Sequence, residues 1–357
     1  MENNKLLSII IPTYNRGGIL PYTLSLWEDQ VERHKDDVEF VICNNASTDN
    51  TIEVLTEYQK RFPFFRIVNY ENHVDVGVSV FRSMTDNAKG TYVLNFGDDD
   101  VPAPMLLDVI VKELKEHPEI NAIVYNRLEG DSWDTAEIAN LSVVEDRFVA
   151  TTRYYADSKI FANEHYREMG FLSVTVVRAK DVIANKQYYS KEYLGYEFLV
   201  PILCAMKGKP AIYIDFPLCI QRHAWGERGK NEWLDKYPLY IYVGHPRVLH
   251  MLESLGIIEN WQSIFNNQRF QKTDDEYYYT IMNCALPHKK MYMPYVDEII
   301  SYQTDNKRIQ MTKELLLSTG VTHKLLLIKW KYYLRGFTYL LALPLKVFKH
   351  VFFRRKK

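Results

Sequence analysis

Three consecutive carboxylates, Asp98-Asp99-Asp100, follow an apolar stretch that reads as a buried strand. Acidic side chains this close repel one another unless a cation lies among them. Oxygen-only ligands suit Mg²⁺ or Mn²⁺, and an ion held by one or two carboxylates usually completes its coordination with phosphate oxygens. The segment therefore indicates a divalent-cation site for a phosphorylated ligand. Taken alone, these residues also fit an Asp-rich cap on a solvated helix.

Two further polar segments follow predicted strands. Residues 12–16 (Pro-Thr-Tyr-Asn-Arg) come after the β-branched run 6–11 and supply an aromatic ring and a guanidinium. Residues 44–49 (Asn-Asn-Ala-Ser-Thr-Asp) come after the apolar run 38–43 and supply amides suited to the edge of a nucleobase. All three segments thus carry groups that bind a nucleotide.

The elements that must position these segments alternate along the first 126 residues. Apolar runs predict strands at 6–11, 38–43, 65–69, 91–96 and 121–125, and helical patterns fall at 19–34, 51–61, 78–88 and 104–116. This alternation predicts a mostly parallel sheet covered by helices on both faces. Ligands of such sheets bind beyond the carboxyl ends of the strands, which selects the loops 12–18, 44–50 and 97–102.

Composition and missing motifs exclude several classes of protein. Hydrophobic residues make up 47% of the 357 residues, which excludes global disorder. Neither GxGxxG after the first strand nor GxxxxGK[ST] occurs, which argues against a dinucleotide-dependent dehydrogenase and a P-loop NTPase. The four cysteines show no CxxC spacing, so neither a disulfide framework nor a zinc site is indicated. The apolar run 6–11 is too short for a signal peptide, so we expect the body of the protein in the cytoplasm.

Charge is distributed unevenly along the chain. Ten of the 44 Lys and Arg residues lie in 321–357, and all 45 Asp and Glu residues precede them, so residues 1–320 carry a net charge of −11. An acidic body of this kind is a poor binder of nucleic acid. We therefore expect no nucleic-acid partner. The basic tail is expected to have a function and a partner of its own.

Taken in order, Ser8–Arg16, Asn44–Thr51 and Gly97–Asp100 resemble the family 2 glycosyltransferases. The resemblance is strong over residues 5–126, weaker to about 225 and absent beyond. It implies the GT-A fold, an α/β, Rossmann-like domain with a mostly parallel sheet flanked by helices, here with a C-terminal helical extension. The expected catalytic domain is 1–230, with a nucleotide-sugar-binding half at 1–126 and an acceptor-binding half at 127–230.

The resemblance also assigns site residues. The DxD element would bind Mn²⁺ or Mg²⁺ between two phosphates, but Gly97 stands where many members carry another Asp, so the ligand pair stays open. Asn44-Asn45 replaces the usual Asp-Asp that reads the base, which weakens any claim for uridine. His223, beside Trp225 in an expected flexible lid, could join the metal ligands. The implied nucleotide contacts are Pro12, Tyr14, Arg16, Asn44, Asn45, Arg82, Asp98 and Asp99, and the implied metal ligands are Asp98, Asp99, Asp100 and His223.

Members of the family are typically inverting enzymes, which need a carboxylate to take the proton from the acceptor hydroxyl. In the family this base precedes an apolar helix in the second half of the domain. Glu197 matches that position in the run 195–201, where its apolar neighbours would raise its pKa. The alternative reading of Glu197 is a helix N-terminal residue that interacts with the dipole, and Glu192 is the alternative base.

The C-terminal third has two parts. Residues 231–320 read as a helical extension without a motif. Residues 321–357 mix leucines, aromatics and cations, and their longest charge-free stretch, 336–345, is half of what a spanning helix needs. Residues 324–357 therefore predict an amphipathic segment in the interface of an anionic membrane. Docking of this segment on the acidic body is the alternative.

Together these features predict an inverting, metal-dependent glycosyltransferase at the inner face of the cell membrane. Its partners would be a nucleotide-sugar donor, with a UDP-sugar favoured, and a glycan or lipid-linked acceptor of cell-surface polysaccharide synthesis. The alternative that is not an enzyme is a catalytically inactive, membrane-tethered binding module. A sugar nucleotidyltransferase is the third reading, for which Gly17-Gly18 is a weak signal.

Overall fold

The computed structural model describes residues 5–130, 152–222, 232–267 and 289–317. The chain divides into two compact units. The first contains Met1–Asn231 and Val243–Phe270, and the second contains Glu232–Tyr242 and Gln271–Lys357. All of the predicted site segments belong to the first unit.

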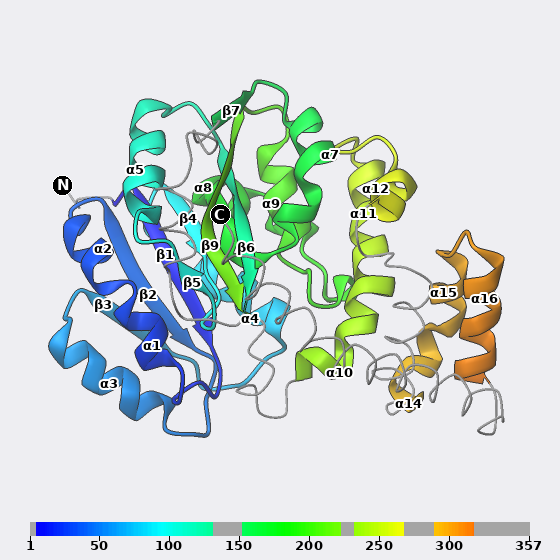
Figure 1. Ribbon diagram of the computed structural model, residues 1–357, viewed down its shortest axis with the longest axis horizontal. Helices are drawn as coiled ribbons and strands as arrows, with labels where there is room; N and C mark the ends of the chain where they lie inside the picture. The colour runs from blue at the N-terminus through cyan, green and yellow to red at the C-terminus, as the bar shows by residue number, and fades with distance from the viewer. Residues whose placement is uncertain (1–4, 131–151, 223–231, 268–288, 318–357) are drawn as a thin grey trace, which may run out of the picture. The chain divides into compact units, whose positions relative to one another are not determined.

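One sheet organises the first unit (Figure 1). In the described residues its strands follow the order β3-β2-β1-β4-β8-β6-β9-β5, and β7 pairs with β9. Neighbours from β3 to β4 are parallel, β8 is antiparallel to both β4 and β6, and β6 is parallel to β9. The strands are β1 (Leu7–Thr13), β2 (Val38–Asn44), β3 (Phe65–Asn69), β4 (Tyr92–Asn95), β5 (Val101–Pro102), β6 (Ala122–Gly130), β7 (Thr152–Tyr155), β8 (Thr175–Arg178) and β9 (Ala211–Arg222).

The parallel strands have the sequence of a sheet buried on both faces. Ile9, Ile10 and Ile11 of β1 are fully buried, and so are Val93 and Leu94 of β4. β-branched and apolar side chains fill both faces because helices cover both. Since β1 pairs in parallel with β2 and β4, the carboxyl ends of these three strands meet at one edge.

The helices of the first unit form two layers. On one side α2 packs on α5 and α1 on α3, and on the other α4 packs on α8, α8 on α9 and α9 on α11. The described α-helices of this unit are α1 (Leu20–Ser25), α2 (Glu28–Arg33), α3 (Thr51–Arg61), α4 (Val76–Asn87), α5 (Leu106–Glu116), α7 (Ser158–Met169), α8 (Ala179–Ala184), α9 (Leu199–Met206), α11 (His245–Ser254) and α12 (Trp261–Asn267).

Two elements are irregular, and one of them differs from the sequence prediction. The helix predicted at 19–34 is divided into α1 and α2 around Trp27, which is fully buried with its ring edge-on to Phe96 at 4.9 Å. β9 continues through Pro217 to Arg222. Its register against β6 shifts at Pro217, and such an irregularity is where a sheet tolerates proline.

The second unit is helical where it is described. Its α-helices there are α10 (Glu232–Leu239), α14 (Lys289–Tyr292), α15 (Val296–Ser301) and α16 (Asn306–Thr312). Within the described ranges, no helix combines the length and the apolar character that crossing a membrane requires. The predicted membrane segment 324–357 lies outside the described residues.

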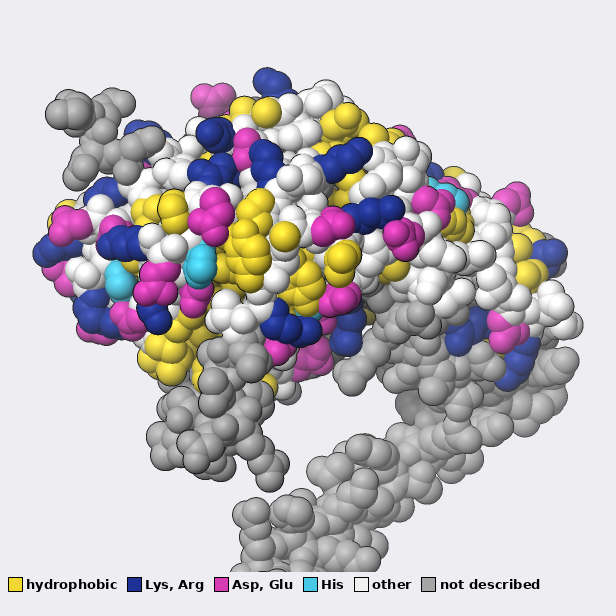
Figure 2. Space-filling model, turned by 90° about the horizontal axis from the view of Figure 1, so that it is seen from above, with side chains coloured by type: hydrophobic (Ala, Val, Ile, Leu, Met, Phe, Trp, Pro, Cys, Tyr) yellow, Lys and Arg dark blue, Asp and Glu magenta, His cyan; other side chains and the backbone are white. Residues whose placement is uncertain are grey.

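Charged side chains of both signs are interspersed over the face shown in Figure 2, with hydrophobic side chains between them. Binding to the phosphates of a nucleic acid needs a continuous basic surface. The described part of this face presents none.

Candidate active site

Asp98 anchors the loop that follows β4. Its Oδ2 accepts a hydrogen bond from the Thr13 hydroxyl (2.7 Å), and its backbone oxygen accepts one from the Thr23 hydroxyl (2.6 Å). Its Oδ1 lies 3.4 Å from Nε of Arg16, and Oδ2 of Asp99 lies 3.6 Å from the same guanidinium. The Asp98 charge raises the pKa of Arg16. The end of β1 and the acidic loop are therefore joined by charge and by hydrogen bonds.

Asp100 is held from the other side. Its Oδ2 accepts a hydrogen bond from the Ser173 hydroxyl (2.6 Å), which itself accepts one from the backbone N–H of Gly97 (2.7 Å). Its Oδ1 accepts one from the backbone N–H of Arg222 (3.3 Å), at the end of β9. A Cβ on Gly97 would lie 2.5 Å from Oδ2 of Asp100, so any larger residue here would have to displace that carboxylate. Ser173 and Arg222 are site residues that sequence reasoning missed, because only the fold brings them to Asp100.

The loops after β1 and β2 are bonded to each other. The backbone N–H of Arg16 donates to the Thr51 hydroxyl (2.9 Å), and that of Thr48 donates to Oδ1 of Asn15 (2.7 Å). Asp49 accepts from Thr51 and from the backbone of Gly17 (3.2 Å). The sequence of residues 44–51, rich in Asn, Ser, Thr and Asp, is thus used to fix the two loops side by side.

The amides of Asn44 and Asn45 are bonded inside the protein. Asn44 is fully buried and contacts Asn69 and Ser47. Asn45 donates to the backbone oxygen of Val74 (2.8 Å), and its Oδ1 accepts from the Val74 N–H (3.1 Å) and from Arg82 (2.9 Å). In this structure Asn44 joins β2 to β3, and Asn45 joins the end of β2 to α4.

Aromatic groups cover this junction. The Tyr14 ring lies on the exposed His73 ring with centroids 4.0 Å apart, and the Arg82 guanidinium lies 3.5 Å from the centroid of Tyr70. Pro12, at the end of β1, is partly exposed. The structure therefore brings Tyr14, Asn45 and Arg82 together through these contacts at the carboxyl edge of the sheet.

Glu197 lies at the amino-terminal end of α4. The residue is 3% exposed, and a methyl group on Gly77 would clash with its carboxylate. Burial raises the pKa of Tyr189, and the negative charges of Glu197 and Asp75 raise it further. Because Asn45 ties the segment before α4 to the end of β2, Glu197 is held at the same edge of the sheet as the acidic loop.

The acidic loop suits a divalent cation by its donor chemistry. Asp98 and Asp100 are buried and already accept hydrogen bonds, whereas the side chain of Asp99 is 18% exposed. Within the described residues, no group of three or more His, Cys, Asp and Glu side chains is placed to hold a metal. An ion that shares its coordination with phosphates needs only one or two carboxylates, and Asp99 is the best placed of the three. His223 lies outside the described residues.

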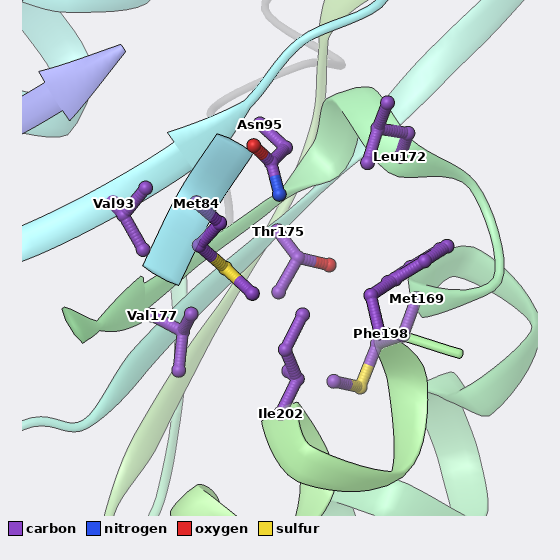
Figure 3. Close-up of a pocket in the computed structure, with 9 residues that line it drawn as sticks. All are labelled: Met84, Val93, Asn95, Met169, Leu172, Thr175, Val177, Phe198 and Ile202. Atoms are coloured by element: carbon purple, nitrogen blue, oxygen red, sulfur yellow. The ribbon is translucent and has the colours of Figure 1, made fainter. Parts of the chain in front are cut away.

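A small cavity lies between the sheet and α9 (Figure 3). Its volume is about 10 Å³, about one water molecule, so it cannot hold a sugar. The buried side chains of Asn95 and Thr175 face it and have no hydrogen-bond partner among the described residues. The rest of the lining is apolar: Met84, Val93, Met169, Leu172, Val177, Phe198 and Ile202.

Substitution of Gly77 tests the placement of Glu197. We expect Gly77→Ala to lower the turnover number by at least tenfold, because the added methyl group must displace the carboxylate. Gly130→Ala is the matched control, since a Cβ there would make only an ordinary contact, 3.8 Å from the Ile220 side chain. Both variants would be compared in the same kinetic assay of sugar transfer and by thermal melting. Equal activity of the two would contradict the geometry of Glu197.

In sequence, the chain is similar to known glycosyltransferases. Residues 8–174 match the family model described as glycosyl transferase family 2. A dolichyl N-acetyl-alpha-D-glucosaminyl phosphate 3-beta-D-2,3-diacetamido-2,3-dideoxy-beta-D-glucuronosyltransferase of Methanococcus voltae is 28% identical over 163 residues. That match covers 44% of this chain and 50% of the relative, so the chain spans about half the length of the relative it matches.

Solved structures share the fold. TarS residues 1–349 of S. aureus, in complex with UDP, give a TM-score of 0.56 at 16% identity, covering 91% of this chain and 87% of that chain. The mannosyltransferase PcManGT of Pyrobaculum calidifontis, in complex with GDP-Man and Mn²⁺, gives 0.51 at 14% identity, covering 87% and 86%. The GT-A fold expected from the sequence is confirmed.

Proposed function

Residues 8–174 form a glycosyltransferase family 2 domain, and from this premise we propose that the protein is an inverting, metal-dependent glycosyltransferase. It would move a sugar from a nucleotide-sugar donor to a hydroxyl group of an acceptor. The observation that carries the proposal is the arrangement at the carboxyl edge of the sheet, where the fold gathers the acidic loop 98–100, Arg16 and the buried carboxylate of Glu197.

The donor nucleotide would bind between the loops after β1 and β2. Tyr14 offers a ring face to the base, and the Arg16 guanidinium offers charge to a phosphate, although both of its ion pairs are now with Asp98 and Asp99. Asn45 and Arg82 hold the start of α4 beside these loops. TarS in complex with UDP and UDP-GlcNAc, and PcManGT in complex with GDP-Man, support a nucleotide-sugar donor without choosing the base.

Glu197 is the proposed general base. A carboxylate can take the proton of the acceptor hydroxyl while that oxygen attacks the anomeric carbon from the side opposite the departing nucleotide. One such attack inverts the configuration at that carbon. Because the Glu197 carboxylate packs against Gly77, the acceptor hydroxyl would come to lie beside the start of α4.

Asp99, with Asp98 or Asp100, would hold Mn²⁺ or Mg²⁺. When bound, such an ion neutralises the negative charge that develops on a departing diphosphate. The Mn²⁺ in the PcManGT complex supports a divalent ion in this fold without choosing which one this chain uses. Thr13, Ser173 and the backbone of Arg222 keep the flanking carboxylates in place for this role.

Binding of nucleoside diphosphates tests the proposal most directly. We expect one of UDP, GDP, CDP and dTDP to bind the purified protein in calorimetry with Mn²⁺, and EDTA to weaken that binding at least tenfold. The responding nucleotide would identify the donor class. A folded protein that binds none of the four would favour the alternative of an inactive binding module.

The acceptor is proposed to lie at a membrane surface, as a lipid-linked or polymeric glycan. This part rests on the basic, aromatic and leucine-rich composition of residues 324–357. We expect deletion of 324–357 to move the protein from the membrane fraction to the supernatant, with nucleotide binding unchanged. Continued sedimentation of the shortened protein with membranes would contradict the role of this segment.

A further inference from the structure

The chain reaches Glu197 through a turn in a costly conformation. Leu194 and Gly195 both have positive φ, at 42° and 83°. A left-handed conformation is unfavourable for a residue with a side chain, so Leu194 adopts it only where surrounding contacts hold it. Those contacts come from the start of α11, which lies outside the family-matched residues 8–174.

Backbone contacts and an ion pair join α11 to this turn. A Cβ on Gly244 would lie 2.5 Å from the backbone oxygen of Tyr193 and 2.8 Å from that of Leu194, so only glycine allows the approach. One turn further, Nη1 of Arg247 donates to the backbone oxygen of Glu192 (2.8 Å) and pairs with Oε2 of its side chain (2.7 Å). One short segment thus contacts the backbone oxygens of three successive residues of the turn.

His245 fixes the residue that precedes Glu197. The imidazole is fully buried, its ring centroid lies 3.7 Å from that of Tyr196, and its Nδ1 shares a hydrogen bond of 2.9 Å with the hydroxyl of Tyr166. Burial lowers the pKa of His245 to about 3, so the ring is neutral at physiological pH. A neutral, hydrogen-bonded ring at this place gives Tyr196 a rigid surface to pack on.

We propose that Gly244–Arg247, the α11 clamp, is a positioning device that sets the direction of the Glu197 carboxylate by holding the turn 192–196. The inference rests on the proposed role of Glu197 as the base and extends it to four residues that do not reach the reacting atoms themselves. His245 and Arg247 are therefore positioning residues.

Gly244→Ala is the sharpest variant. We expect its kcat to fall at least tenfold and its KM for the nucleotide-sugar to change less than twofold, because the clamp acts on the acceptor base and not on the donor loops. Ser254→Ala is the matched control, since Ser254 is an exposed residue of the same helix whose hydroxyl bonds to Met251, one turn back. Arg247→Ala repeats the test at a partly exposed residue, because this change removes contacts without adding a clash.

A double-mutant cycle separates positioning from general damage. A residue that acts only through Glu197 has no effect once that carboxylate is gone, so Gly244→Ala should lower the residual rate of Glu197→Gln by less than twofold. Additive losses, or wild-type activity in both Gly244→Ala and Arg247→Ala, would overturn the clamp and leave the proposed function standing. Full activity in Glu197→Gln would overturn the base assignment and the clamp together.

Discussion

Replacement of Glu197 by Gln is expected to lower kcat about 10³-fold, within the range that general bases contribute. Glutamine keeps the shape of the side chain but cannot accept the proton of the acceptor hydroxyl. Its amide fits the same position against Gly77, so the fold around α4 and the donor loops should be unchanged. Calorimetric titration with the nucleoside diphosphate should therefore give a Kd within about twofold of the wild-type value.

Two further variants make this result specific. Glu192→Gln tests the alternative base, whose side chain is 77% exposed and paired with Arg247. Glu53→Gln, on the exposed face of α3, controls for the loss of one negative charge. A 10³-fold loss in Glu192→Gln together with an active Glu197→Gln would transfer the role of base to Glu192. If all three variants bind the nucleotide with the same Kd, differences in their kcat report on catalysis and not on donor binding.

The sheet could be predicted from sequence because its signals are local. β3 at 65–69 and α3 at 51–61 have the predicted bounds, since an apolar strand or an amphipathic helix is visible in consecutive residues. The three site loops follow from the same patterns, because parallel strands end at one edge. The division of the first predicted helix could not be predicted. The helical pattern continues through Trp27, but the chain breaks there and its ring is fully buried.

The contacts within the site could not be predicted in this way. Asn45 meets Val74 and Arg82, and Ser173 meets Asp100, across separations of 29 to 73 residues. No local pattern indicates whether an Asn at a strand end will read a ligand or hold a neighbouring loop. The sequence could place Asn45 at the edge of the sheet, but the hydrogen bonds that occupy its amide depend on the packing of α4.

The three consecutive carboxylates are expected to have different roles, and Asp99 to be the one that function needs most. Asp99→Asn should reduce sugar transfer by about 10³-fold, since a metal ion contributes several kcal/mol to charge stabilisation at the leaving group. Its side chain is the most exposed of the three, at 18%, and lies 3.6 Å from the Arg16 guanidinium. The melting temperature should therefore change little, while nucleotide binding with Mn²⁺ should fall to the level seen in EDTA.

Asp98→Asn provides the contrast, because Asp98 holds the loop itself. This buried carboxylate accepts from Thr13 and is paired with Arg16, so its replacement should cost about 1–2 kcal/mol of folding stability and several degrees in Tm. Asp100→Asn, bonded to Ser173 and to the backbone of Arg222, should lose both stability and transfer. Thermal melting and metal-dependent nucleotide binding, measured on all three variants, separate the two roles. If Asp99→Asn binds the nucleotide with Mn²⁺ as the wild type does, the proposed metal site does not include Asp99, and Asp98 with Asp100 becomes the ligand pair to test.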